Sequence, residues 1–305
     1  MSLVAGCGEP DAPVIQAPTA GSARSLNDVL GTPGATRVQT PLLLFVGAND
    51  LTAGKTVRFP FRIFEKDGSA IHPEGGRAEL YFAQSGQSEA IGPFPALELS
   101  LRGEGVRFDR EGTETVLIAE GVPLPAAGMW FVAATFTVAG KKASAANEFS
   151  VLSKEATPAV GSDAPRSDTP TLADVGGDAT RISTQRPVDT SLLHDSVKDL
   201  LAEKRPFVVV FATPEFCESR VCGPVVDIVL NVQKRMRATE MTFVHLEIYK
   251  NLDPEQGASP WVSEWGLPSE PWVFVVDANG KVAAKFESAV TERELESAAR
   301  AALKP

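Results

Sequence analysis

Two of the three cysteines in this 305-residue chain, Cys217 and Cys222, stand with four residues between them. They come shortly after the apolar run 207–211, which is typical of a buried strand. A strand that leads into a turn with a close cysteine pair, and then into a helix, is the layout of a thiol-disulfide site, because a helix N-terminus stabilises a thiolate. The spacing therefore predicts redox chemistry at this pair.

The composition limits the other classes of function. The chain carries a net charge of −10 and has no basic stripe, which argues against a nucleic-acid partner. Hydrophobic residues at 43% and charged residues at 22% are ordinary values for a globular protein of about two domains. No apolar run approaches the roughly 20 residues that span a bilayer. Nothing in the sequence predicts a cofactor.

The elements around the cysteines can be read from periodicity. Apolar residues at 192–201 predict an amphipathic helix, and a second helix follows Cys222. Two short strands joined through Asn279 and Gly280 predict a tight hairpin. Thr291 and Glu294 form a capping box that begins the last helix. The predicted order is helix, strand, helix, strand, short helix, hairpin and helix.

Two segments carry a family resemblance. Residues 207–224 resemble the first active-site strand and loop of the thioredoxin superfamily, and residues 265–277 resemble its second landmark. In that family a glycine is followed about five residues later by a cis-proline, and Gly266 and Pro271 have this spacing. The resemblance implies an α/β thioredoxin-like domain at 189–305.

The same resemblance implies a partner-binding surface beside the cysteines. Pro271, with Glu270 next to it, would place backbone groups against a partner polypeptide that brings a protein thiol or disulfide. Trp265 and Trp272 flank this proline and would line an apolar groove. The alternative is that at least two of the tryptophans in this region belong to the core.

The cysteine spacing departs from the CxxC of thioredoxins. In one arrangement Cys217 takes the place of the first cysteine, as in the bacterioferritin-comigratory peroxiredoxins. In the other, Cys222 is that cysteine and Val225 replaces the second. Pro224 is tolerated in a first helical turn but costs about 3 kcal/mol or more in a helix interior. The helix is therefore expected to begin near Cys222, which favours Cys222 as the nucleophile.

Three other uses of the pair stay open. A peroxidase of the peroxiredoxin kind needs a threonine three residues before its cysteine, where Pro214 or Ser219 stands here. A structural disulfide is the second alternative. A metal site with His245 or His194 is the third, but two cysteines and one remote histidine are a weak signal, so no metal is predicted.

The proton relay of this family has no obvious counterpart. Its buried aspartate would fall at Val210, which cannot carry a proton. Glu215 or Glu218 would have to serve instead.

The first half of the chain has a period of two, typical of strands. Apolar residues alternate with polar or smaller ones at 57–63 and 130–138, and about seven short β-rich runs occur between residues 42 and 152. This spacing predicts an all-β immunoglobulin-like sandwich at 39–152. Segments rich in proline, glycine and serine predict a flexible tether at 1–38 and a linker at 153–188.

The third cysteine bears on the compartment. Residues 3–7, which end at Cys7, resemble a bacterial lipobox, whose cysteine becomes the lipidated N-terminus. Only six residues precede Cys7, fewer than a full signal peptide needs, so either the start is truncated or the resemblance is chance. The expectation is an extracytoplasmic thiol-disulfide oxidoreductase, anchored to the cell membrane through lipid on Cys7. The alternative is a non-catalytic binding or scaffold lipoprotein with a structural disulfide.

Overall fold

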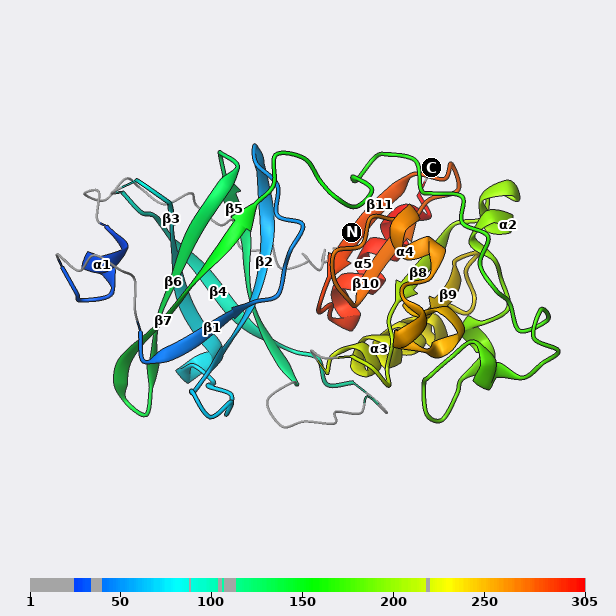
Figure 1. Ribbon diagram of the computed structural model, residues 1–305, viewed down its shortest axis with the longest axis horizontal. Helices are drawn as coiled ribbons and strands as arrows, with labels where there is room; N and C mark the ends of the chain where they lie inside the picture. The colour runs from blue at the N-terminus through cyan, green and yellow to red at the C-terminus, as the bar shows by residue number, and fades with distance from the viewer. Residues whose placement is uncertain are drawn as a thin grey trace, which may run out of the picture.

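The computed structural model describes residues 25–33, 40–87, 89–103, 106, 114–217 and 220–304. Within these residues the chain forms a seven-stranded barrel followed by a separate four-stranded sheet with its helices (Figure 1). Cys7, the expected lipidation site, lies outside the described residues. Among the helices of the described chain, none has the length and apolar character required to cross a bilayer.

The barrel is made by the alternating segments of the first half. Its core contains side chains from every strand, among them Phe59, Leu80 and Val132, each fully buried. The strands are β1 (Leu42–Val46), β2 (Lys55–Phe64), β3 (Arg77–Gln84), β4 (Ile91–Ser100), β5 (Thr115–Leu124), β6 (Gly128–Val138) and β7 (Lys141–Val151).

The expected immunoglobulin-like sandwich is wrong. The seven strands follow the order β1-β2-β5-β4-β3-β6-β7 and close on themselves, so the architecture is one barrel and not two packed sheets. Closure depends on a parallel pairing of β1 with β7, in which Leu42 and Leu43 face Ala145 and Ala146. A period of two identifies strands but carries no information about which edges meet, and this is why the sequence did not predict closure.

The second sheet has the order β11-β10-β8-β9. Only β8 and β9 run parallel, and the other neighbours are antiparallel. Helices α3 and α5 pack on the face that carries Val208 and Val210, whereas α2 and α4 pack on the face that carries Phe207 and Phe211. The elements are α2 (Val197–Ala202), β8 (Phe207–Phe211), α3 (Cys222–Met236), β9 (Thr242–Leu246), α4 (Pro260–Glu264), β10 (Trp272–Val276), β11 (Val282–Glu287) and α5 (Glu292–Ala302).

The expected α/β thioredoxin-like fold class is also wrong. The described chain is mostly β, a barrel plus a second sheet with few helices, and this is not an ordinary α/β thioredoxin fold. The helix predicted across 192–201 illustrates the difference. Asp189 caps a short 3-10 turn, η3 (Thr190–Leu192), and the α-helix begins only at Val197 and has six residues.

Several local predictions are confirmed. The hairpin β10–β11 turns at Gly280, whose φ is +74°. The capping box forms, because Thr291 accepts a hydrogen bond from the Glu294 N–H while the Glu294 carboxylate accepts one from the Thr291 N–H. The helix after the cysteine loop begins at Cys222. Short-range chemistry therefore placed these elements correctly.

Parts of the expected tether and linker are ordered. Residues 25–33 contain α1 (Leu26–Val29), and Leu26 packs against Ala83 and Ala133 of the barrel. In the segment 153–188, the N–H of Gly161 donates to the carbonyl of Val282, so the chain runs along the edge of β11. The remaining described helical turns are 3-10 turns: η1 (Glu74–Gly76), η2 (Ala179–Arg181), η4 (Lys250–Leu252) and η5 (Pro254–Gln256).

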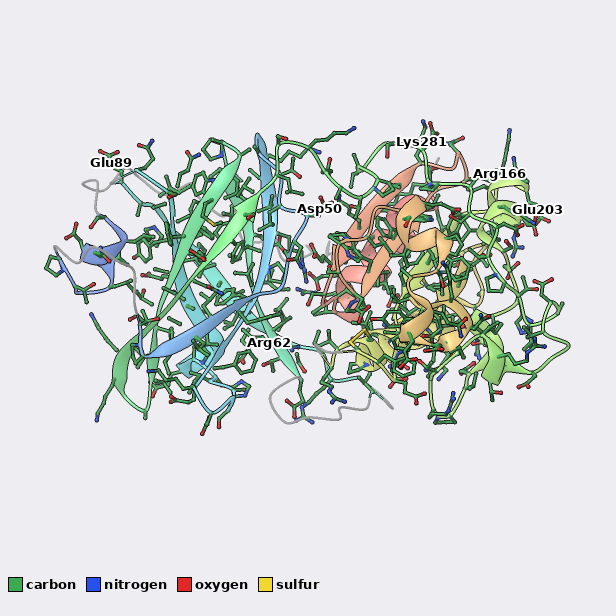
Figure 2. The ribbon with its side chains drawn as sticks, in the orientation of Figure 1. Asp50, Arg62, Glu89, Arg166, Glu203 and Lys281 are labelled. Atoms are coloured by element: carbon green, nitrogen blue, oxygen red, sulfur yellow. A yellow bond between two sulfur atoms is a disulfide. The ribbon has the colours of Figure 1, made fainter. Side chains whose placement is uncertain are left out.

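The barrel and the second sheet meet through buried charge. Asp50, at the barrel's side toward the sheet (Figure 2), has a side chain only 1% exposed and pairs with Lys285 of β11 at 2.9 Å. The Lys285 ammonium also donates to Thr157 and pairs with Glu155. An apolar cluster continues across the same junction from Ile118 into the sheet. The two parts therefore share one of their apolar clusters, while each also has a cluster of its own.

Glu287 is a further carboxylate at this junction. It accepts hydrogen bonds from the N–H groups of Asn49 and Asp50 and from the hydroxyl of Ser269. Burial raises the pKa of Glu287 above its usual value, and these hydrogen bonds oppose the effect. A carboxyl group whose folded-state pKa is raised contributes stability at low pH and loses it as the pH rises through that pKa.

Glu287→Gln is expected to abolish the decrease in the free energy of unfolding that Glu287 causes as the pH rises. The free energy of unfolding of the variant, minus that of the wild type, should increase as the pH rises from about 4 to about 7. Urea unfolding followed by circular dichroism at several pH values measures the difference. Glu296→Gln is the control with the opposite sign: hydrogen bonds from Arg300 and Arg235 lower the pKa of Glu296, so its difference should fall as the pH rises, and most of this change should occur below about pH 5. For Glu287→Gln, a difference in the free energy of unfolding that does not change with pH would contradict the raised pKa of Glu287.

Candidate functional site

The site lies at one end of the two central strands of the second sheet, where β8 ends and β10 begins. In the antiparallel pair β8–β10, the last residue of β8, Phe211, faces the first residue of β10, Trp272. The chain that leaves β8 toward Cys217 therefore lies beside the chain that enters β10 through Glu270 and Pro271. Residues more than fifty positions apart are brought together by this register.

Cys217 and Cys222 form a disulfide, with their Cα atoms 6.0 Å apart. The backbone N–H of Cys222, the first residue of α3, points at the Cys217 sulfur, with the nitrogen 3.3 Å from Sγ. The helix has no side-chain cap, since its N-cap residue is Val221. Free N–H groups at a helix start favour a negative charge, so a thiolate of Cys217 would be stabilised there.

Both cysteines are buried. Both belong to the apolar cluster beneath α3, and Cys217 is 4% exposed where Cys222 is 0% exposed. Pro224 occupies the first turn of α3, as predicted. Cys217 is therefore the outer and Cys222 the inner member of the pair.

Glu270 completes a three-residue cluster with the cysteines. One carboxylate oxygen of Glu270 and the two sulfur atoms all lie within 4.8 Å of one another. Glu270 is half-buried, and the peptide bond to Pro271 is cis. The sequence pointed to Glu270 only as a partner-binding neighbour of Pro271. Its position beside the sulfurs follows from the β8–β10 register, which no local pattern shows.

The loop before Cys217 is held by a buried polar network. Glu247, 4% exposed, accepts two hydrogen bonds from Thr184, and the Thr184 hydroxyl accepts one from the N–H of Glu215. His245 is also buried, with Nε2 3.1 Å from the carbonyl oxygen of Ala212. These contacts fix the backbone on which Cys217 stands.

The tryptophans expected at a partner groove are enclosed. Trp265 is 0% exposed, packs between Phe211 and Phe274, and donates to Ser167. Trp272 is 2% exposed and stacks on Phe274 with ring centroids 5.5 Å apart. The alternative that at least two tryptophans belong to the core is confirmed. A partner would reach these rings only after movement of the surrounding chain, so their role in binding stays a prediction.

The other expected proton and metal groups do not join the cluster. Val210 is fully buried in β8, and Glu215 is exposed. Glu218 lies outside the described residues. His245 is engaged by Ala212, and His194 is exposed. In the part of the chain that the structure describes, Cys217, Cys222 and Glu270 are the three potential metal ligands that come together.

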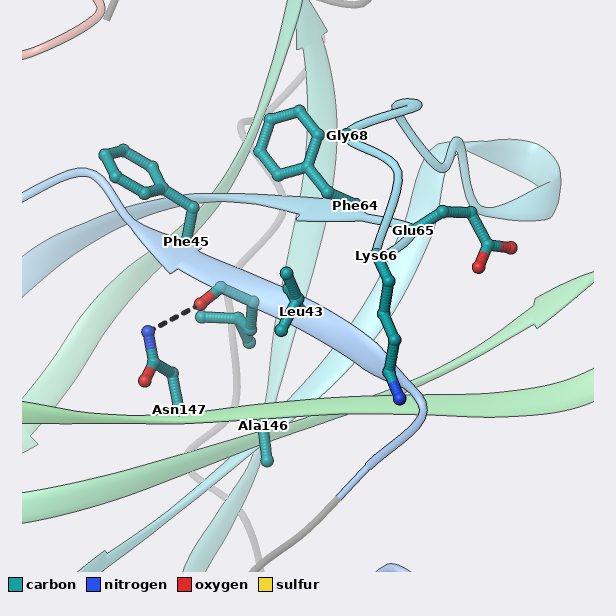
Figure 3. A pocket seen from close by; sticks show the side chains of 9 residues that line it. Leu43, Phe45, Phe64, Glu65, Lys66, Gly68, Ala146 and Asn147 are labelled. Carbon is teal, nitrogen blue, oxygen red and sulfur yellow. Dashed lines mark hydrogen bonds between the residues drawn. The ribbon is translucent and has the colours of Figure 1, made fainter.

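The barrel carries a separate apolar hollow of about 390 Å³. The rings of Phe45 and Phe64 stand beside it (Figure 3), and Phe45 is 51% exposed. Asn147 of β7 donates to the carbonyl of Leu44 at its floor. No cysteine or histidine lines this hollow. It is a surface feature of the barrel, distant in sequence from the cysteine cluster.

No family model matches the sequence, and no curated protein matches it. A solved thiol:disulfide interchange protein of the thioredoxin family from Chlorobium tepidum TLS is 18% identical, with a TM-score of 0.33 over 47% of this chain and 97% of that one. Titin domain M4 is 10% identical, with a TM-score of 0.17 over 38% of this chain and 100% of its own. At these values the likenesses assign no family or activity to this chain.

The disulfide itself should contribute modestly to stability. It joins residues five positions apart, and for so short a loop the entropy model gives about 2 kcal/mol. Reduction of the wild type is therefore expected to lower the free energy of unfolding by about 2 kcal/mol, measured by urea unfolding with and without a phosphine reductant. The double variant C217S/C222S should show no response to the reductant. A loss of about 5 kcal/mol would mean that the bond supports structure beyond its own loop.

Proposed function

We propose that this protein is a thiol-disulfide oxidoreductase that uses the pair Cys217 and Cys222. The observation that carries the proposal is the disulfide at the start of α3, with the N–H of Cys222 directed at the Cys217 sulfur. An N–H group and a helix N-terminus stabilise a thiolate, which is the form of cysteine that attacks disulfides.

Cys217 is proposed as the attacking residue and Cys222 as the resolving one. The helix start at Cys222 made that residue the first choice from the sequence. The hydrogen bond supports the reverse assignment, because the Cys217 sulfur accepts the N–H of Cys222, and the residue Cys217 is 4% exposed where Cys222 is 0% exposed. A partner disulfide can approach the outer sulfur with less displacement of the core.

The reaction consists of two exchanges. The Cys217 thiolate attacks one sulfur of the partner disulfide, the partner's S–S bond breaks, and its other sulfur leaves as a thiolate. The Cys222 thiolate then attacks the Cys217 sulfur of the mixed disulfide, which releases the second partner thiol and closes the Cys217–Cys222 bond. Two electrons pass from the pair to the partner. The opposite direction follows the same steps in reverse.

The partner is proposed to be a protein thiol or disulfide that lies against Glu270 and cis-Pro271. The proposal also places the protein outside the cytoplasm, attached to a membrane by lipid on Cys7. Two observations support this location: the lipobox-like residues 3–7 and a disulfide, which persists in oxidising compartments.

A structural disulfide in a non-catalytic binding or scaffold protein is the second candidate. The observation in its favour is burial, because Cys217 is 4% and Cys222 is 0% exposed. In this candidate the pair stays oxidised and the barrel performs the recognition.

A mixed-disulfide trap separates the two candidates. Proteins that carry the wild-type pair, Cys222→Ser or Cys217→Ser, each in a Cys7→Ser background so that the third cysteine forms no adduct, are reduced, treated with glutathione disulfide and examined by intact mass spectrometry. Cys222→Ser is expected to retain one glutathione on Cys217, because the resolving thiol is missing, whereas Cys217→Ser should accumulate far less. The wild type should finish oxidised and free of adduct.

The outcomes are distinct. If adduct accumulates only on Cys217→Ser, Cys222 is the nucleophile. If neither variant forms adduct and the wild-type pair has a potential below about −300 mV, the disulfide is structural and the redox proposal fails.

The membrane anchor has its own test. The full-length precursor, expressed in a bacterium, should yield an N-terminal peptide that begins at a diacylated Cys7, as found by mass spectrometry of the membrane fraction. An unmodified Cys7 in that fraction would contradict the anchor and leave the redox proposal untouched.

A further inference from the structure

The cluster at the start of α3 has the composition of a metal site once the disulfide is opened. Cys217 and Cys222 then offer two thiolates, and Glu270 offers a carboxylate from the chain that enters β10, the neighbour of β8. Thiolates select thiophilic cations and exclude Mg²⁺ and Ca²⁺, while one carboxylate oxygen suits Zn²⁺ well. We propose that the reduced protein binds one Zn²⁺ ion through Cys217, Cys222 and Glu270.

The distances agree with this set of ligands. Bonds of about 2.3 Å to sulfur and about 2.0–2.2 Å to oxygen place the ligands of a tetrahedral zinc ion roughly 3.5–3.8 Å apart. The three donor atoms already lie within 4.8 Å of one another. Reduction lets the two sulfurs move apart from bonding distance to that separation, which is a small movement for a side chain in the loop and one at the start of α3.

The surroundings of the cluster fit a zinc ion with one coordination position open. Three protein ligands leave the fourth place of a zinc ion for water or a further thiol. Among the residues that the structure describes, a Cβ atom added at Gly223, beside Cys222, would meet no atom within 4 Å apart from its own helix and chain neighbours, so there is open space at the first turn of α3 on that side. The N–H of Cys222 points at the Cys217 sulfur and would orient that ligand, because hydrogen bonds to a metal-binding side chain fix its position.

The electron and proton balance is simple. A dithiol reductant gives two electrons and two protons to the Cys217–Cys222 bond and forms its own disulfide. Zn²⁺ then displaces the two thiol protons and binds the thiolates together with the ionised Glu270 carboxylate. Metal binding and disulfide formation therefore exclude each other. The inference requires only that the pair be reducible, and it does not depend on catalysis of exchange.

The test uses the full-length protein, reduced under anaerobic conditions. Co²⁺ is added as a spectroscopic substitute for Zn²⁺, and Zn²⁺ affinity is measured by competition with a chromophoric chelator. The wild type should bind one ion per chain with a thiolate-to-cobalt charge-transfer band, and the oxidised protein should bind none. Cys217→Ser and Cys222→Ser should each lose most of this band.

Glu270→Gln decides whether the carboxylate is a ligand. This variant should bind Zn²⁺ at least about tenfold more weakly and should shift the cobalt spectrum, whereas Glu270→Asp should recover part of the affinity. Glu215→Gln changes an exposed carboxylate on the loop that carries Cys217; it is the matched control and should bind as the wild type does. Circular dichroism checks that each variant is folded.

Three results would overturn the inference: wild-type affinity in Glu270→Gln, one metal ion shared by two chains, or the absence of a charge-transfer band in the reduced wild type. None of them bears on the glutathione trap, which is run without metal and in the presence of a chelator. Failure of the zinc site and failure of the redox proposal are therefore distinguishable.

Discussion

The pairing of β8 with β10 is the constraint on which the site depends. All five residues of β8 are fully buried, with Val208 and Val210 on one face and Phe207, Val209 and Phe211 on the other. A strand packed on both faces cannot slip by one residue without turning its side chains into the wrong layer. The register that sets Phe211 opposite Trp272 is therefore firmly determined. Because of this register, the loop to Cys217 and the peptide before Pro271 lie at the same end of the two central strands. Glu270 therefore lies beside the sulfurs.

The barrel supports the same sheet from outside. Lys285 of β11 reaches Asp50 of the barrel, and Glu287 of the same strand accepts N–H bonds from the barrel chain. Strand β11 is an edge strand of the second sheet, and the hydrogen bond from the Gly161 N–H to the Val282 carbonyl covers part of its open edge. A buried ion pair of this kind contributes little net stability, but loss of one partner is costly, so it specifies the relative placement of the two parts.

The sequence predicted what short-range chemistry controls. Pro224 indicated a helix start near Cys222, Gly280 indicated the hairpin turn, and Thr291 with Glu294 indicated the last cap, and each is present. It did not predict closure of the barrel, which depends on the parallel pairing of β1 with β7, strands separated by about a hundred residues. It also did not place Glu270 beside the cysteines. Both failures concern the register between distant strands, which no local period encodes.

The two proposed uses of the cysteine pair compete for the same atoms. A thiolate bound to zinc is a poor nucleophile toward a disulfide, and a sulfur in a disulfide is not a zinc ligand. The N–H of Cys222 stabilises negative charge on Cys217 in either case, so it does not choose between them. Glu270 bears on the choice, because an oxygen donor beside the two sulfurs completes a zinc site, whereas the exchange reaction does not use it. In the proposed zinc site this carboxylate would therefore link the redox state of the pair to the availability of zinc.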